Sequence, residues 1–131
     1  VMTPLLQIVV CMTALTFISI VLGAALRNRE WTLDGMKVGL SNRDNLPTAT
    51  PMGGRAERAA HNTKENFLLF LALAFVAHAA GMGEQAAFGA SLFFWARVAY
   101  LPIYILGITY LRSAVWAVGI AGLVLMLQAL Y

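Results

Sequence analysis

The feature that most constrains this chain is a stretch without any charged residue, over residues 4–26. It is about 23 residues long, and a helix of that length is long enough to span the hydrocarbon core of a bilayer, which is roughly 30 Å thick. It is too long for the apolar core of a signal peptide, and no positive residue precedes it. We therefore predict that residues 4–26 form a retained transmembrane helix.

The composition extends this prediction to the rest of the chain. Of the 131 residues, 60% are hydrophobic and 11% are charged, whereas a soluble domain carries about 25% charged residues. A soluble core of this proportion would need a much larger protein around it. Further apolar helices are expected at about residues 55–80, 85–107 and 113–130. The predicted fold class is all-α: a transmembrane four-helix bundle in one domain, residues 1–131, with a long loop at residues 27–54.

The basic residues are gathered at one end of the predicted helices. Seven of the nine lysine and arginine residues fall within residues 27–64, and the other two are Arg97 and Arg112. By the positive-inside rule, the first and third loops are cytoplasmic and both termini lie outside. Nucleic-acid binding is a poor interpretation, because these residues flank apolar helices and have no separate folded face.

Two polar stripes are predicted to carry the chemistry. Arg58, Asn62 and Glu65 are spaced i, i+4 and i+7, with His61 beside them, and Arg97, Tyr100 and Tyr104 repeat such a stripe on the next helix. An arginine within an apolar helix costs about 2.5–3.5 kcal/mol on insertion, so we predict that Arg97 pairs with Glu65, in one subunit or across two. The stripes are either a solvated extension with a structural ion pair, or a cytoplasmic pocket for a small anionic molecule.

The remaining residue types do not indicate a metal site or a phosphate-binding site. The single cysteine, Cys11, and His78 lie in apolar segments, and we expect both side chains to have a packing role only. No cluster of cysteine or histidine has metal-ligand spacing. No glycine-rich phosphate loop is present.

The segments that carry these stripes resemble a known family. The residues from Arg55 to Glu65 are similar to the second-helix signature of the MAPEG family, the membrane-associated proteins of eicosanoid and glutathione metabolism. Residues 96–104 resemble its third helix, and Arg112-Ser113 resembles the start of its fourth. The long first loop, with its segment at residues 41–44, is more similar to that of bacterial members.

The resemblance implies a fold, an assembly and a cofactor. It implies a homotrimer, placement in a bacterial inner membrane, and glutathione bound at the cytoplasmic side between helices of adjacent subunits. The implied catalytic residues are Arg112, which would stabilise the glutathione thiolate, and Ser113. The implied glutathione-binding residues are Arg58, His61, Asn62, Glu65, Arg97, Tyr100 and Tyr104, with Arg27 or Arg29 as a first-helix arginine near the site.

Two functions from different classes remain open at this point. The first is a glutathione-dependent membrane enzyme, a transferase or peroxidase that acts on lipophilic electrophiles. The second is a non-catalytic membrane protein of the same fold that binds a lipid or an anionic metabolite. We further expect the first loop to fold over the site, with Asp44 contacting Arg112 or another site arginine.

Overall fold

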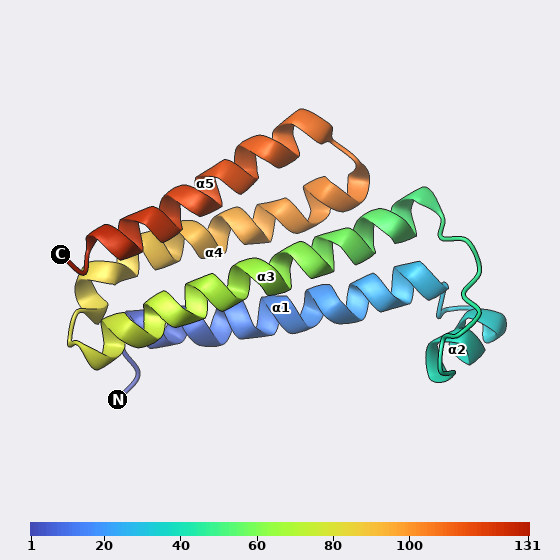
Figure 1. Ribbon diagram of the computed structural model, residues 1–131, viewed down its shortest axis with the longest axis horizontal. Coiled ribbons are helices and arrows are strands. Elements are labelled where there is room, and N and C mark those ends of the chain that lie inside the picture. Colours follow the sequence, from blue (N-terminus) through green and yellow to red (C-terminus); the bar gives the residue numbers. More distant parts are fainter.

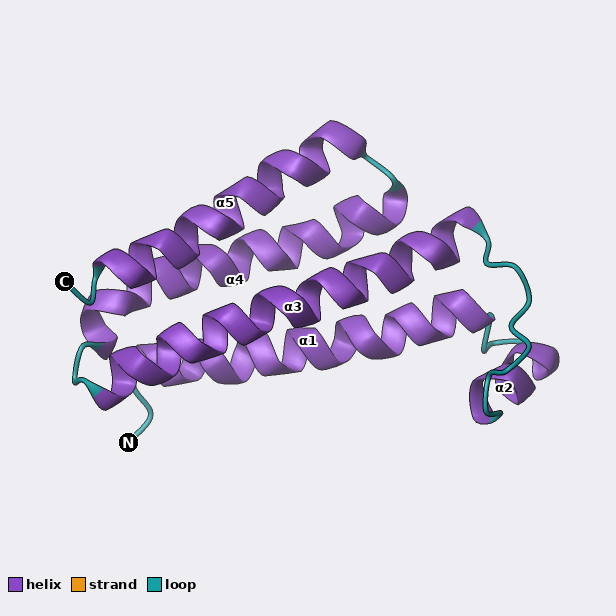
Figure 2. Ribbon diagram, viewed as in Figure 1, coloured by secondary structure: helices purple, strands orange, loops and turns teal.

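The computed structural model describes residues 1–131, and every regular element in it is a helix (Figure 2). The five helices are α1 (Pro4–Asn28), α2 (Leu33–Leu40), α3 (Pro51–Ala79), α4 (Gly83–Leu106) and α5 (Thr109–Gln128). Three of them, α1, α4 and α5, are long and apolar enough to cross a membrane. The long helix α3 is not among these three, because its first half is polar. The predicted all-α class is confirmed.

The four long helices lie side by side, and the short helix α2 stands beyond the end of α1 (Figure 1). Both chain termini and the turn between α3 and α4 lie at one end of the molecule, whereas α2 and the turn between α4 and α5 lie at the other. This opposite end also holds Arg27, Arg58 and Arg112, so we call it the basic end and the other the terminal end. The first and third loops thus share one end, as the charge distribution predicts.

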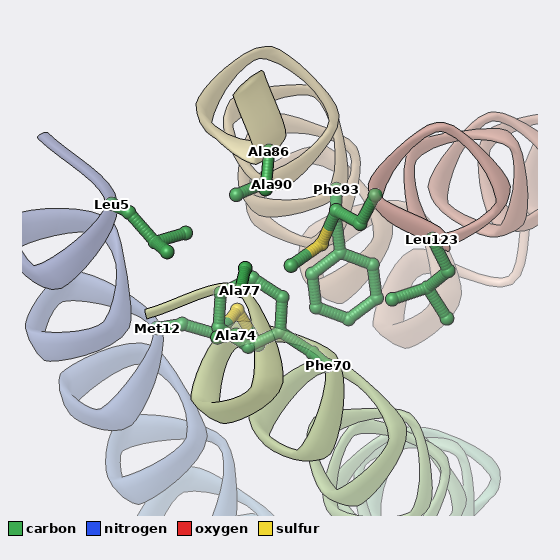
Figure 3. Packing of buried hydrophobic residues seen from close by; sticks show 10 residues of the cluster. Leu5, Met12, Phe70, Ala74, Ala77, Ala86, Ala90, Phe93 and Leu123 are labelled. Carbon is green, nitrogen blue, oxygen red and sulfur yellow. The ribbon is translucent and has the colours of Figure 1, made fainter. Parts of the chain in front are cut away.

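The main apolar core lies toward the terminal end (Figure 3). Phe70 of α3 stacks on Phe93 of α4, with ring centroids 4.9 Å apart, and both rings are fully buried. Alanines fill most of the remaining positions on these two helices. The other members of the core are Leu5 and Met12 of α1 and Leu123 and Met126 of α5.

Glycines let neighbouring helices approach closely at two places. A Cβ atom on Gly89 would lie 2.6 Å from the carbonyl oxygen of Gly122, and a Cβ atom on Gly122 would lie 2.7 Å from that of Gly89. Between α1 and α3, a Cβ atom on Gly23 would lie 3.1 Å from the Cβ atom of Ala60. Small residues at helix contacts are the usual means of close packing in membranes.

Two helix starts differ from the expected positions. Helix α3 begins at Pro51 rather than near residue 55, because Thr50 caps it by accepting a hydrogen bond from the backbone N–H of Gly53 at 3.0 Å. Helix α5 begins at Thr109 rather than residue 113.

Helix α2 lies inside the segment that was expected to be a loop. Its N-cap Thr32 accepts a hydrogen bond from the N–H of Gly35 at 3.0 Å. The segment is therefore partly ordered as helix, and its residues 33–40 form two turns.

Candidate functional site

A polar cavity of about 380 Å³ opens between α3, α4 and α5 toward the basic end. This volume lies within the range of small-molecule sites, roughly 300–1,000 Å³. Helix α3 contributes four lining residues, α4 contributes two and α5 contributes three. The lining residues are Arg58, His61, Asn62, Glu65, Tyr100, Tyr104, Arg112, Ser113 and Trp116.

The polar stripes seen in the sequence therefore face one space. Eight of the nine lining residues belong to the set expected from the sequence. Their helical spacing explains the gathering, since residues three, four and seven apart lie on one face of a helix. Two arginines, one glutamate, one histidine and three hydroxyl groups meet in this cavity.

Arg97 lies behind the cavity wall and ties α4 to α3. Its side chain is buried, and its two terminal nitrogens donate to Asn62 Oδ1 at 2.9 Å and Thr63 Oγ1 at 2.7 Å. The guanidinium carbon also lies 3.9 Å from the centroid of the Tyr100 ring. Arg97 is not among the lining residues, so it positions Asn62 and Tyr100 instead of touching a ligand in this cavity.

The predicted ion pair between Arg97 and Glu65 is wrong within the chain. Glu65 is exposed, and no carboxylate lies within 4 Å of the Arg97 guanidinium. The physical reason is that Asn62 and Thr63, one turn earlier on α3, offer neutral oxygen acceptors at hydrogen-bonding distance. Hydrogen bonds to neutral oxygens thus replace the expected charge pairing.

Two aromatic rings connect this buried arginine to Arg112. Tyr100 and Tyr104 meet edge to face, with centroids 5.4 Å apart and an interplanar angle of 81°. The guanidinium carbon of Arg112 lies 4.8 Å from the centroid of the Tyr104 ring. A cation over an aromatic face is attracted by the ring quadrupole, and this contact holds Arg112 beside the cavity.

A second, smaller cavity of about 230 Å³ adjoins the first at the basic end. Arg58, Tyr104 and Arg112 line both cavities, and Arg55 lines only the smaller one. The Nε–H of Arg55 donates to the carbonyl oxygen of Ile105 at 2.8 Å, which joins the start of α3 to the end of α4.

Trp116 is a lining residue that the sequence interpretation missed. It follows Arg112 by four positions and Ser113 by three, so all three lie on one face of α5. That spacing is the signal that identifies it. Its indole is partly exposed and forms an apolar part of the wall.

Arg27 and Arg29 lie around a different cavity, of about 310 Å³, between the end of α1 and the first loop. Arg27 donates to the carbonyl oxygen of Pro47 at 2.9 Å, and its Nε lies 3.7 Å from the carboxylate of Glu57. The chain alone does not bring these two arginines to the cavity between α3, α4 and α5.

The first loop does not fold over the main cavity within the chain. Asp44 is exposed, forms no ion pair with Arg112 and is not a lining residue, so the expected contact is wrong within the chain. The physical reason is that the loop packs against the end of α1 and the start of α3, away from the α4–α5 turn (Figure 1).

The arrangement suits a small polar molecule that carries several charges. Two guanidinium groups can bind carboxylates through paired hydrogen bonds, and a carboxylate such as that of Glu65 can bind an ammonium group. A guanidinium that stays positive at all relevant pH values also favours the anionic form of a nearby thiol.

Comparison with known proteins identifies the chain by its family. The model of the MAPEG family matches residues 5–131, which is nearly the whole chain. Among curated proteins, none matches the chain at a significant level. The three apolar helices agree with the membrane character of that family. The chain is therefore an integral membrane protein that belongs to the MAPEG family.

Proposed function

We propose that this protein is a glutathione-dependent membrane enzyme, a transferase or peroxidase that acts on lipophilic electrophiles. The observation that carries the proposal is the convergence of Arg58, Glu65 and Arg112 on one polar cavity between three helices. The non-catalytic alternative, binding of a lipid or an anionic metabolite, predicts no reactive thiolate in this cavity.

The cavity matches glutathione in charge. Glutathione carries two carboxylates, one ammonium group and a thiol. We propose that Arg58 binds a carboxylate, Glu65 binds the ammonium group, and Asn62 and His61 donate or accept further hydrogen bonds. Tyr100 and Tyr104 would contact the molecule from α4.

Arg112 is proposed to act on the thiol. Bound glutathione would supply a sulfur nucleophile, and the nucleophilic form of a thiol is the thiolate. The Arg112 guanidinium stabilises that anion and lowers the pKa of the thiol. The hydroxyl of Ser113, the next residue on the cavity wall, is available as a hydrogen-bond donor to the same group.

The proposed assembly is a trimer of four-span protomers. Glu65 lies in α3 and is exposed in the single chain, although α3 packs along the membrane-spanning α1. Charged groups that face lipid are costly, so a second copy is expected to cover this face. In the proposed orientation the basic end is cytoplasmic and both termini lie on the other side of a bacterial inner membrane.

Calorimetric titration of the detergent-solubilised protein with glutathione tests the proposal. We expect saturable binding to the parent and weaker binding to Arg58→Gln. Lys37→Gln is the matched control, because it removes a positive charge from exposed residues of α2, outside the cavity. No binding to the folded parent would overturn the glutathione proposal.

The same titration decides the role of the first-helix arginines. Arg29→Gln removes a charge from the separate cavity of the first loop. Weakened glutathione binding in this variant would mean that α1 of a neighbouring copy completes the site. Unchanged binding would exclude Arg29 from the site.

A further inference from the structure

The short helix α2 turns its apolar residues away from the protein. Leu33, Met36 and Leu40 are spaced i, i+3 and i+7, so they form one stripe, and they are 74%, 45% and 82% exposed. Gly35 and Gly39, spaced i and i+4, lie on a neighbouring face, roughly 110° around the helix from this stripe. A helix that sits on a protein in water normally does the reverse and buries its apolar stripe.

Steric contacts fix this orientation. Gly35 is buried, and a side chain there would clash with the carbonyl oxygens of Asn28 and Arg29. A Cβ atom on Gly39 would lie 2.9 Å from the carboxyl carbon of Glu30. The glycine face therefore fits closely against the end of α1, and the helix cannot rotate to bury its larger side chains.

The segment after α2 returns to the level of the apolar part of α1. Arg43 lines a groove of about 160 Å³ together with Ile20, Gly23 and Ala24. At a rise of 1.5 Å per residue, these three positions lie about 3–9 Å inside Leu26, where the apolar run ends. The Arg43 side chain thus reaches the end of the apolar run of α1, and Trp31, which is 66% exposed, is a residue type favoured at a membrane interface.

The same groove carries excess positive charge. Its charged lining consists of Arg43, Lys64 and Glu57, with His61 as a further titratable group. Glu57 lies within 3.7 Å of Arg27, which offsets its charge. Arg43 uses one terminal nitrogen to donate to the carbonyl oxygen of Gly39 at 3.1 Å, and a guanidinium has four more N–H groups to offer.

We propose that the first loop binds anionic phospholipid. The stripe of Leu33, Met36 and Leu40 lies in the acyl boundary of the bilayer, as in other amphipathic surface helices. The phosphate of a neighbouring lipid lies between Arg43 and Lys64, above the apolar floor formed by Ile20 and Ala24. Arg43 and Lys64, the two residues proposed to bind the phosphate, do not line the main cavity, and His61 is the one residue that lines both.

Spin labels on α2 test its place in the bilayer. Cys11 is the only cysteine, so Met36→Cys and Asp34→Cys are each made in a Cys11→Ser protein and labelled in lipid nanodiscs. Met36 lies on the apolar stripe, and Asp34 is the matched exposed position off the stripe. We expect the label at position 36 to collide more with oxygen than with a water-soluble nickel chelate, and the label at position 34 to do the reverse.

Two results would overturn this part of the proposal. Equal access of the nickel chelate to both labels would place α2 in water. Protection of the label at position 36 from both reagents would mean that a second copy of the chain covers the stripe.

Lipid selectivity tests the basic groove. Native mass spectrometry of the protein with equal amounts of phosphatidylglycerol and phosphatidylcholine gives the ratio of the two lipids bound. We expect Lys64→Gln to lower the preference for phosphatidylglycerol about fivefold. Lys37→Gln, which removes an exposed lysine from outside the groove, should change it less than about twofold.

Comparing Lys64→Gln with Lys37→Gln distinguishes a defined lipid-binding site from diffuse electrostatic attraction of anionic lipids. Equal loss of preference in both variants would contradict a defined site between Arg43 and Lys64. Inorganic phosphate should not displace the lipid, because the apolar floor contributes to binding. Displacement by inorganic phosphate at constant ionic strength would show a free-anion site instead.

Discussion

The terminal end and the basic end of the molecule hold the same helices together by different means. At the terminal end, Phe70 stacks on Phe93, and the backbones of Gly89 and Gly122 come into contact. At the basic end, Arg97 joins α4 to α3 by hydrogen bonds, and a cavity of about 380 Å³ separates the helices. One end is closed by packing, whereas the other adds polar bonds to a smaller apolar cluster of α3 and α4 and keeps a cavity open.

The difference shows how a membrane protein makes a site within a bundle. Lipid tails are as apolar as the helices, so no hydrophobic force drives helices together, and association depends on close packing and hydrogen bonds. The packed end supplies stability and leaves the basic end free to hold polar side chains. The comparison predicts that substitutions at the two ends have different consequences.

The largest effect is expected where the packed end is broken. A Cβ atom on Gly122 would lie 2.7 Å from backbone atoms of both Gly89 and Phe93, so Gly122→Leu forces α4 and α5 apart. We expect a loss of about 3 kcal/mol or more in the free energy of unfolding. Ala121→Leu, at the exposed neighbouring position, should change it by less than about 0.5 kcal/mol. Thermal unfolding followed by circular dichroism measures both, and equal melting would refute the packed contact.

At the open end, Arg112→Leu should act on chemistry instead of on folding. One nearby positive charge lowers a thiol pKa by about 1–3 units, so the variant should reduce the ratio of thiolate to thiol in bound glutathione about 10- to 1,000-fold. The thiolate and its reactivity are present above the lowered pKa and are lost as the pH falls through it. Ultraviolet absorbance of bound glutathione against pH measures this. An unshifted thiol titration in the parent protein would remove Arg112 from the proposed mechanism.

A smaller effect is expected for the hydrogen bonds that join α3 to α4. Thr63→Val leaves a terminal nitrogen of Arg97 without its acceptor at 2.7 Å, and the protein should lose about 1–3 kcal/mol in stability. Glu65→Gln should cost less than about 0.5 kcal/mol, because Glu65 is exposed and unpaired within the chain. If Glu65→Gln is the more destabilising of the two, an ion pair across subunits holds the basic end.

The smallest effect concerns the apolar wall of the cavity. Trp116→Leu removes a partly exposed indole that lines the cavity, and the Kd for glutathione should rise by about fivefold or less. Trp95→Leu is the control, because Trp95 is an exposed tryptophan of α4 outside the cavity. Equal effects of the two substitutions in calorimetry would show that Trp116 does not contact the ligand.

The cavity could be predicted from spacing, but its internal contacts could not. The stripe of Arg58 and Glu65 and the stripe of Arg97 and Tyr104 each follow from helical periodicity. The partner of Arg97 depends on the axial register of α4 against α3, and Asn62 and Glu65 differ by less than one turn. Sequence periodicity does not determine that register. The sequence therefore indicates Glu65 as the partner of Arg97, whereas Asn62 and Thr63 accept its hydrogen bonds in the structure.

The first loop shows a second limit. Thr32 as an N-cap and the spacing of Leu33, Met36 and Leu40 were visible signals for a short helix. Gly35 and Gly39 weaken these signals, since glycine is a poor helix former and short isolated helices are marginal in water. The close fit of those glycines against α1 is a tertiary contact, which outweighs local propensity.

The buried guanidinium of Arg97 also has a consequence for how the chain enters the bilayer. Alone, α4 would carry an unpaired charge into hydrocarbon at a cost of about 2.5–3.5 kcal/mol. Its two acceptors lie 34 and 35 residues earlier, on α3, whose own first half is polar. Helix α4 is apolar enough to span a membrane, but its arginine is satisfied only by α3, and only the short turn at residues 80–82 separates the two helices. We therefore expect α3 and α4 to leave the translocation machinery together, as a preformed helical hairpin.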